Sequence, residues 1–114
     1  MNDPLPRRGE IWLVNFNPGR GSEQKGIRPA LIIQNDTGNH YASTTIVAAI
    51  TTTIKIYPVT VFLPAKNVGL SKDSMVNLAQ ILTVDKMRLR KKLGKLSEKL
   101  MTRVDVALKI SLDL

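Results

Sequence analysis

The first clear pattern along the chain is an alternation of side chains over residues 10–16. The two alternating sets are Ile11, Leu13 and Asn15 on one side, and Trp12, Val14 and Phe16 on the other. This period of two is typical of a β-strand. Residues 17–26 follow as a polar stretch with three glycines and one proline. That composition predicts a loop that is too long for a tight hairpin.

Four further apolar runs predict strands at residues 30–33, 44–50, 57–63 and 75–84. The run at 44–50 is β-branched and nearly free of charge, so we expect it to be a buried central strand. Residues 35–39 carry Asn, Asp and Gly, which predict a turn. The first of the four runs follows Arg28-Pro29, which places a proline at the start of a strand, where it disturbs no pairing.

The pattern changes after Val84. Residues 85–87 predict a short helical turn, and Gly94 within residues 93–96 prevents a longer helix. Ser97 is a good N-cap for a helix over 98–112. The apolar stripe of this helix consists of Leu100, Val104, Ala107, Leu108 and Ser111, widened by Met101 and Leu112.

Roughly five short strands followed by one amphipathic helix predict a mainly β protein with minor α content, a small barrel with a helix packed against it. The chain has 114 residues and 12.6 kDa, near the size of one domain. We therefore expect a single domain over residues 1–114.

Composition excludes several chemistries. The chain has no cysteine, so disulfides, thiolate metal sites and cysteine nucleophiles are excluded. His40 is the one histidine, which rules out a pair of histidines as acid and base within one subunit. It stands next to Tyr41 in an apparent loop, and we expect it to be a surface residue without a role. No secretory signal or membrane-spanning run is visible, so we expect a cytoplasmic protein with no membrane partner.

The charge points towards a polyanion. Lys and Arg number 17 against 9 Asp and Glu, a net charge of +8, which makes nucleic acid the first candidate partner. Most of the excess lies between residues 86 and 103, where the only acidic residue is Glu98. This cluster has two interpretations, a solvated surface that keeps the protein soluble or a face that attracts phosphate.

No motif for a metal or a cofactor is present. His40 has no second ligand at a suitable spacing, and the Gly19-Arg20-Gly21 stretch lacks the rest of a phosphate-binding or dinucleotide fingerprint. We therefore expect neither a metal nor a nucleotide cofactor.

The loop that ends near residue 29 has the most interesting composition. Glu23, Lys25 and Arg28 concentrate charge there, and a guanidinium donates two hydrogen bonds to a phosphate. A surface pair of Glu23 and Arg28 with little energetic effect is the simpler interpretation from composition alone. The hydroxyls of residues 51–53 can also donate to a phosphate, although threonine is equally a common strand residue.

The ordered motifs of this chain resemble the MazF/PemK toxin endoribonucleases. The matching segments are GEIWLVNFNP at residues 9–18, GSEQKGIRPALIIQ at 21–34, AITT at 49–52 and QI at 80–81. The resemblance implies an SH3-like β-barrel of the CcdB/PemK type and a homodimer. It also implies metal-independent and ribosome-independent cleavage of single-stranded mRNA at a short sequence, giving 2′,3′-cyclic phosphate and 5′-hydroxyl ends.

Roles for individual residues follow from the same resemblance. Arg28 corresponds to the family's catalytic arginine, which contacts the scissile phosphate and acts as acid, base or both. Thr51 corresponds to the threonine that holds a non-bridging phosphate oxygen, with Thr52 as the alternative because the run of three threonines permits a shift of one residue. Glu23 would orient the guanidinium of Arg28.

Other residues are expected to bind the RNA. Phe16 would stack on a base, and Gln80 would read a base edge with its amide. The loop residues expected to close over the RNA are Arg20, Ser22, Gln24 and Lys25.

The resemblance further implies an acidic, MazE-like antitoxin as partner, which the charge of +8 also favours. Two other functions stay open for the same barrel. One is a non-enzymatic gyrase poison like CcdB, and the other is an RNA-binding barrel without catalytic activity.

Overall fold

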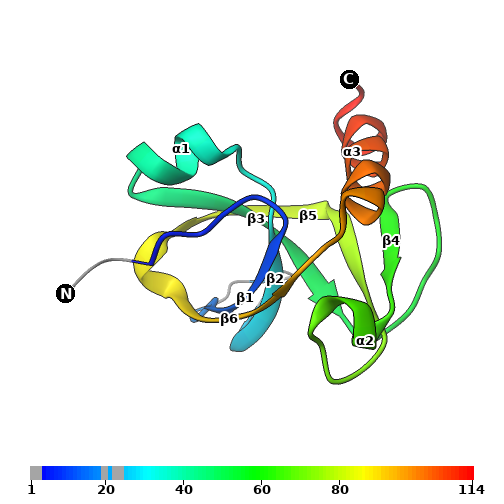
Figure 1. Ribbon diagram of the computed structural model, residues 1–114, viewed down its shortest axis with the longest axis horizontal. Coiled ribbons are helices and arrows are strands. Elements are labelled where there is room, and N and C mark those ends of the chain that lie inside the picture. The colour runs from blue at the N-terminus through cyan, green and yellow to red at the C-terminus, as the bar shows by residue number, and fades with distance from the viewer. Residues whose placement is uncertain (1–3, 19–20, 22–24) are drawn as a thin grey trace.

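The computed structural model describes residues 4–18, 21 and 25–114. Along the chain its elements are β1 (Glu10–Asn15), β2 (Ile27–Ile32), α1 (Asp36–Tyr41), β3 (Thr44–Thr51), β4 (Thr60–Leu63), α2 (Ala65–Val68), β5 (Ser74–Asp85), the 3-10 turn η1 (Lys86–Arg88), β6 (Leu89–Lys95) and α3 (Glu98–Leu112). Figure 1 shows a strongly curved sheet, with α1 and α3 over two separate parts of it and α2 near the ends of β4 and β5. The predicted mainly β fold with a C-terminal helix is confirmed.

The described strands form one sheet of six strands in the order β4-β5-β3-β2-β1-β6. All neighbouring strands are antiparallel. β3 lies between β5 and β2, as expected of a central strand, and residues 47–50 within it are buried. The two edge strands, β4 and β6, do not pair with each other, so the barrel is open on that side.

Two glycines let the open side of the barrel pack tightly. A Cβ atom on Gly94 of β6 would lie 2.1 Å from the carbonyl oxygen of Val68, and one on Gly69 would lie 2.3 Å from the carbonyl oxygen of Leu93. Gly69 also ends α2 with a φ of +84°, a conformation that favours glycine. The backbone of α2 therefore touches β6 at a distance that no side chain permits.

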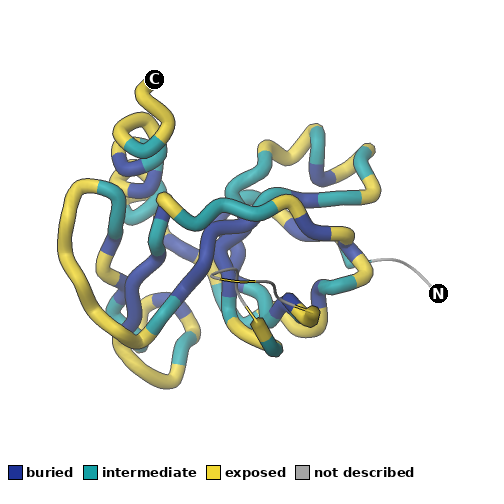
Figure 2. The backbone as a smooth tube through the Cα atoms, turned by 180° about the vertical axis from the view of Figure 1, so that it is seen from behind, coloured by how far each residue is buried: buried dark blue, intermediate teal, exposed yellow. Residues whose placement is uncertain are grey.

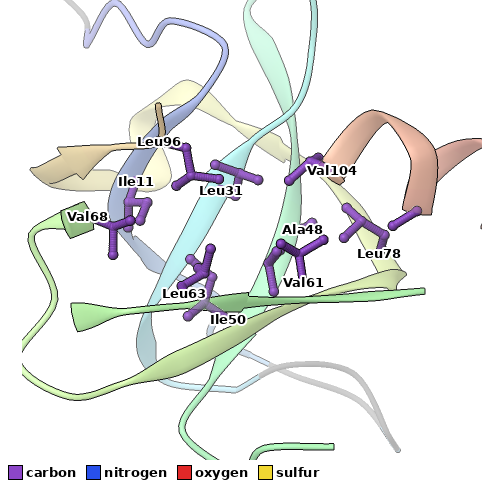
Figure 3. Packing of buried hydrophobic residues seen from close by; sticks show 12 residues of the cluster. Ile11, Leu31, Ala48, Ile50, Val61, Leu63, Val68, Leu78, Leu96 and Val104 are labelled. Carbon is purple, nitrogen blue, oxygen red and sulfur yellow. The ribbon is translucent and has the colours of Figure 1, made fainter. Parts of the chain in front are cut away.

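Alternate residues of the central strands enter two different hydrophobic clusters. The larger cluster includes Ile11, Leu31, Ala48, Ile50, Val61, Leu63, Val68, Val76, Leu78, Leu96, Val104 and Ala107. The smaller one consists of Val14, Phe16, Ala30, Ile32, Val47, Val84 and Leu89. Figure 3 shows side chains of the larger cluster converging from the strands and from Val104 of α3, and Figure 2 shows that burial is concentrated along the central strands.

Helix α3 has the bounds that the sequence predicts. The Ser97 hydroxyl accepts a hydrogen bond from the Leu100 N–H at 3.2 Å, which caps the first turn. Val104 and Ala107 are buried against the sheet, and Leu100 and Leu108 pack at the margin. The expectation that Leu112 widens the stripe is wrong, because its side chain is exposed beyond the end of the sheet.

The predicted turn at residues 35–39 is the start of a helix, α1. Asn35 accepts from the Gly38 N–H at 2.8 Å and so caps it. Asn39 is buried, and its amide bonds to the Gln34 carbonyl and to the Thr45 hydroxyl. These bonds hold α1 on β3, which is why a sequence typical of a turn becomes helical.

Strand β6 was not predicted, because Lys-rich residues 89–95 with Gly94 do not look like a strand. It forms as an edge strand on β1, with Leu89 opposite Val14, and its lysines face solvent. β2 begins at Ile27, earlier than expected, so Pro29 lies inside it. β4 begins at Thr60 rather than at residue 57.

The predicted helical turn after Val84 is confirmed as η1, which Asp85 caps by accepting from the Met87 N–H at 2.9 Å. None of the described helices is long and apolar enough to cross a membrane.

Candidate active site

The pairing of β2 with β3 brings Arg28 and Thr51 to the same end of the sheet. Ala30 stands opposite Ala49 in this antiparallel pair. The same register, carried two residues further, aligns Arg28 with Thr51, and both residues still belong to their strands. Side chains at matching positions of neighbouring strands lie on the same face. The register therefore directs the two residues that the sequence predicts to be catalytic to the same end and the same face of the sheet, beyond the last described pair, Ala30 and Ala49.

The register also distinguishes the candidate threonines. Successive residues of a strand point to opposite faces, so Thr51 shares the face of Ala49 and Arg28. Thr52 follows the end of β3 and is exposed. The Thr51 oxygen accepts a hydrogen bond from the Thr53 N–H at 3.1 Å, and within the described part of the chain its hydroxyl proton has no acceptor. Thr51 is the better placed of the two to donate to a phosphate.

Arg28 lies exposed at the start of β2, opposite Val14 of β1. Its Nε donates to the carbonyl oxygen of Lys25 at 3.0 Å, which orients the guanidinium along the loop end. Among residues 4–18, 21 and 25–114, no carboxylate forms an ion pair with Arg28. Within these residues, the hydrogen bond of Arg28 uses Nε and leaves both terminal nitrogens for an anionic ligand.

Several predicted site residues lie outside the described residues. These are Arg20, Ser22, Glu23 and Gln24. The orientation of Arg28 by Glu23 and the RNA contacts of the other three therefore stay predictions. Lys25, which follows them, is described and exposed.

Phe16 does not lie on the surface. It is 7% exposed and packs in the smaller cluster with Val14 and Ala30. A ring buried in this way offers little surface for stacking, so the predicted contact with a base is disfavoured. Its N–H donates to the Gly26 carbonyl at 2.9 Å, which makes Phe16 part of the loop's base.

Gln80 lies on β5 at an irregularity of the sheet. Ala48 pairs with Ile81, but the next residue, Ala49, pairs with Asn77, so three residues of β5 bulge between these positions. The Asn77 amide oxygen accepts from the Ala79 N–H at 2.9 Å and shapes this bulge. Bulges redirect side chains next to functional sites. Gln80 lies within this bulge, where the alternation of faces along β5 is interrupted: Leu82 pairs with Val47 after the bulge, and Asn77 pairs with Ala49 before it.

Sequence reasoning missed the hydrogen bonds that hold the loop between β1 and β2. Arg88, at the end of η1, donates from Nη1 to the carbonyl oxygens of Asn15, at 3.0 Å, and of Asn17. The Asn17 amide oxygen accepts from the Gly26 N–H at 2.9 Å on the other side of the loop. No local signal marks Arg88, which is more than 70 residues away in the chain.

The basic cluster between residues 86 and 103 is not one surface. Lys86 is 7% exposed and Arg88 is engaged by the loop. Lys92 lies 2.9 Å from the carboxylate of Glu10. The other members, Arg90, Lys91, Lys95, Lys99 and Arg103, are exposed. A single phosphate-binding face made of the whole cluster is therefore wrong, although its exposed members still add positive potential.

Glu10 is the centre of a structural network. Burial raises the pKa of its carboxyl, but the hydrogen bonds from Lys92, from the Trp12 indole at 3.0 Å and from the Arg7 N–H at 2.8 Å outweigh burial and hold the pKa below its ordinary value. The Arg8 N–H likewise lowers the pKa of the Asp36 carboxyl. Both carboxylates stabilise the strand start rather than line the site of Arg28.

An apolar groove of about 480 Å³ runs between α3 and the segment around β4. Its exposed apolar residues include Ile56, at 68%, and Val106, at 55%, together with Phe62 and Ile110. Arg103 is the one charged residue that lines it. No local sequence pattern marks this surface, because its residues come from two distant segments of the chain.

His40 is exposed and its ring meets Tyr41 edge-on, as expected of a surface residue. In the part of the chain that the structure describes, no group of three or more His, Cys, Asp or Glu side chains is arranged to hold a metal ion.

Comparison with known proteins agrees with this arrangement. Residues 7–112 match the family described as the PemK-like, MazF-like toxin of type II toxin-antitoxin systems. The chain is 54% identical over 111 residues to the endoribonuclease MazF of Staphylococcus epidermidis, covering 95% of this chain and 92% of that protein.

Two solved structures share the fold over nearly their full length. MazF of Deinococcus radiodurans superposes with a TM-score of 0.84 at 26% identity, covering 98% of this chain and 100% of the other. A MazE-MazF structure from the same organism gives a TM-score of 0.78 at 28% identity, covering 98% and 99%.

Proposed function

Because this chain belongs to the PemK-like, MazF-like family of toxins of type II toxin-antitoxin systems, we propose that it is an endoribonuclease that cleaves single-stranded mRNA at a short sequence without the ribosome. The observation that carries the proposal is the alignment of Arg28 with Thr51 at the end of β2 and β3, in a chain that is 54% identical to an endoribonuclease.

The reaction we propose uses the nucleophile of the RNA itself. The 2′-oxygen attacks the adjacent phosphorus and loses its proton, the bond from phosphorus to the 5′-oxygen breaks, and the 5′-oxygen gains a proton. The products are a 2′,3′-cyclic phosphate and a 5′-hydroxyl. The step needs no metal and no covalent intermediate with the protein.

Arg28 and Thr51 act on the charge of the phosphate. The free terminal nitrogens of Arg28 form a fork that suits two phosphate oxygens. The Thr51 hydroxyl donates to a non-bridging oxygen, where negative charge grows in the transition state. A positioned donor of this kind lowers the activation free energy by on the order of 3 kcal/mol. Because a guanidinium stays protonated at neutral pH, we assign Arg28 to stabilising the charge on the phosphate.

The RNA contacts we propose lie around this pair. Lys25 is exposed at the loop end and meets a phosphate, and Gln80 reads a base edge from the bulge of β5. Arg20, Ser22 and Gln24 join them from the loop, and Thr52 contributes from the end of the strand. Glu23 has a different role, to orient the guanidinium of Arg28.

We also propose a homodimer through the groove between α3 and β4. The groove exposes Ile56, Phe62, Val106 and Ile110, and an exposed apolar patch of this kind marks an interaction site. Its lining holds one charged residue, so it suits a second copy of the same apolar surface better than an acidic peptide.

An acidic antitoxin is the partner we propose for the basic face. Solved structures of related chains contain MazE or a cognate antitoxin, and the net charge of this chain is +8. A negatively charged segment that covers Lys25 and Arg28 would exclude RNA. We expect the protein to act in the cytoplasm, where mRNA is available.

The test is cleavage of a complex RNA pool in the presence of a metal chelator, with mapping of the ends and analysis of their chemistry. We expect cuts at one short sequence with cyclic phosphate ends, and none with Arg28→Ala. Intact RNA together with trapped DNA breaks would indicate a gyrase poison instead. Salt-sensitive RNA binding without any cleavage would indicate a binding barrel.

A further inference from the structure

Arg88, which directly precedes the start of β6, connects this part of the chain to the base of the loop between β1 and β2. Its Nη1 donates to the carbonyl oxygen of Asn15 at 3.0 Å and also to that of Asn17. The two carbonyls flank Phe16, at the point where β1 ends. One guanidinium nitrogen thus holds the carbonyl of the last residue of β1 and the carbonyl of Asn17, which follows the strand.

Further hydrogen bonds connect Asn17 and Phe16 across the base of the loop to Gly26, next to the candidate active site. The Asn17 N–H donates to the Asn15 amide oxygen at 3.0 Å, and the Asn17 amide oxygen accepts from the Gly26 N–H at 2.9 Å. The Phe16 N–H donates to the Gly26 carbonyl at 2.9 Å. Gly26 lies two residues before Arg28. A continuous set of hydrogen bonds therefore runs from Arg88 to the start of β2.

Arg88 is itself firmly placed. Asp85 caps η1 through the Met87 N–H at 2.9 Å. The next residue, Leu89, is buried in the smaller cluster and pairs with Val14 of β1. The backbone on both sides of Arg88 is therefore fixed against the strand whose end its side chain holds.

We propose that Arg88 is a positioning residue of the active site, which holds Asn15 and Asn17 so that Arg28 meets the scissile phosphate in the productive geometry. The inference rests on the proposed function of the Arg28 site. Misplacement of a reacting group by about 1 Å lowers a rate by roughly 100-fold. Loss of the Arg88 bonds frees the loop base and lets Arg28 move by such an amount.

A direct contact between Arg88 and RNA is the competing explanation, and salt separates the two. Each phosphate contact with single-stranded nucleic acid contributes about −0.7 to the slope of log K against log salt. A positioning residue contributes nothing to this slope. The measured quantities are kcat, KM and the salt slope of RNA binding for the wild type and for three variants.

The variants are Arg88→Ala, Arg88→Lys and, as a matched control, Arg90→Ala. Arg90 lies two residues away, is exposed and also donates to a carbonyl oxygen, that of Met87 at 2.9 Å, but this bond is local. Arg90→Ala therefore removes the same positive charge as Arg88→Ala but leaves the hydrogen bonds to Asn15 and Asn17 in place. The Arg88→Lys variant keeps the charge, but its nitrogen is one bond closer to the backbone and falls short of both carbonyls.

We expect Arg88→Ala to lower kcat by roughly 10- to 100-fold, with KM within about threefold and an unchanged salt slope. Arg88→Lys should recover only part of kcat, and Arg90→Ala should stay within about twofold of the wild type. Amide hydrogen exchange should accelerate at Gly26 and Phe16 in Arg88→Ala and stay unchanged at Val104, which reports the core. Because exchange is read residue by residue, it still tests the hold on the loop if the variant loses global stability.

Full activity of Arg88→Ala, or full rescue by Arg88→Lys together with a slope reduced by about 0.7 in Arg88→Ala, would overturn the proposal. Unchanged amide hydrogen exchange at Gly26 in Arg88→Ala would also overturn the proposal. If the wild type itself cleaves no RNA, the proposed function fails, whereas the exchange experiment still decides whether Arg88 holds the loop.

Discussion

Arg28 and Thr51 lie in two antiparallel strands, each two residues beyond the last described pair, Ala30 and Ala49, whose register relates them. They are 23 positions apart in a 114-residue chain, and the long connection through α1 separates them. The relationship converts two candidate residues into one site. It also gives a geometric reason to prefer Thr51 to Thr52 as the candidate.

The first prediction separates the three threonines. Thr51→Ala should lower kcat by 100- to 1,000-fold, because it removes a donor to the developing charge on the phosphate. Thr51→Ser should restore most of the rate, and Thr52→Ala should cause a smaller loss. Thr53→Ala is the control, since only its backbone N–H contacts Thr51. Single-turnover cleavage of a labelled RNA measures all four, and a larger loss in Thr52→Ala than in Thr51→Ala would shift the assignment by one residue.

The second prediction concerns the open side of the barrel. Gly94→Ala should lower the free energy of unfolding by about 1–3 kcal/mol, because the new Cβ would lie 2.1 Å from the Val68 carbonyl oxygen. Gly38→Ala is the comparison, since its Cβ meets only the Gln34 side chain, at 3.1 Å. Urea denaturation gives both values. Equal losses in the two variants would mean that α2 and β6 separate easily.

The third prediction is a pH dependence at Glu10. Its pKa is lowered in the folded state, so its contribution to stability is fully present above the unfolded pKa of about 4.3. The contribution disappears as pH falls through the lower folded pKa. Glu10→Gln should therefore be less stable than the wild type at pH 7, and the difference should shrink as the pH falls from about 5 to 3. A constant difference over this range would show that the charge of Glu10 contributes nothing.

The fourth prediction tests the groove between α3 and β4. Ile110→Glu should convert a dimer into a monomer at micromolar concentration, because it places a charge within an apolar interface. Lys109→Glu is the matched control, since Lys109 is the exposed neighbour on α3 and does not line the groove. Light scattering coupled to gel filtration reports the mass. A dimer that persists in Ile110→Glu would place the interface elsewhere.

The two helices at the ends of the fold show why sequence patterns predict some elements better than others. Helix α3 was predicted with its observed bounds because a cap and a stripe of apolar residues are local signals. At helix α1 the sequence predicts a turn, because these residues favour turns and the stability of the helix depends on the buried Asn39, which bonds to Gln34 and Thr45. Those partners are known only once the chain has folded.

The candidate site likewise has features that local sequence patterns predict and features that depend on tertiary contacts. The residue types at Arg28 and Thr51 and their place at strand ends were predictable, since motifs and apolar runs are written along the chain. The burial of Phe16 was not predictable, because its position in the smaller cluster depends on contacts with β2 and β6. Arg88 gave no signal at all, since it acts on carbonyl groups more than 70 residues away.

The sequence by itself determined the class of fold, the basic character and the candidate chemistry of arginine and threonine without cysteine. These follow from composition, from the periods of strand and helix, and from ordered motifs, all of which are local properties. Only the tertiary structure decided the register that relates β2 to β3, which lysines and arginines stay on the surface, and what holds the loop at its base. Those outcomes depend on strand register and on contacts between distant segments, which no local pattern specifies.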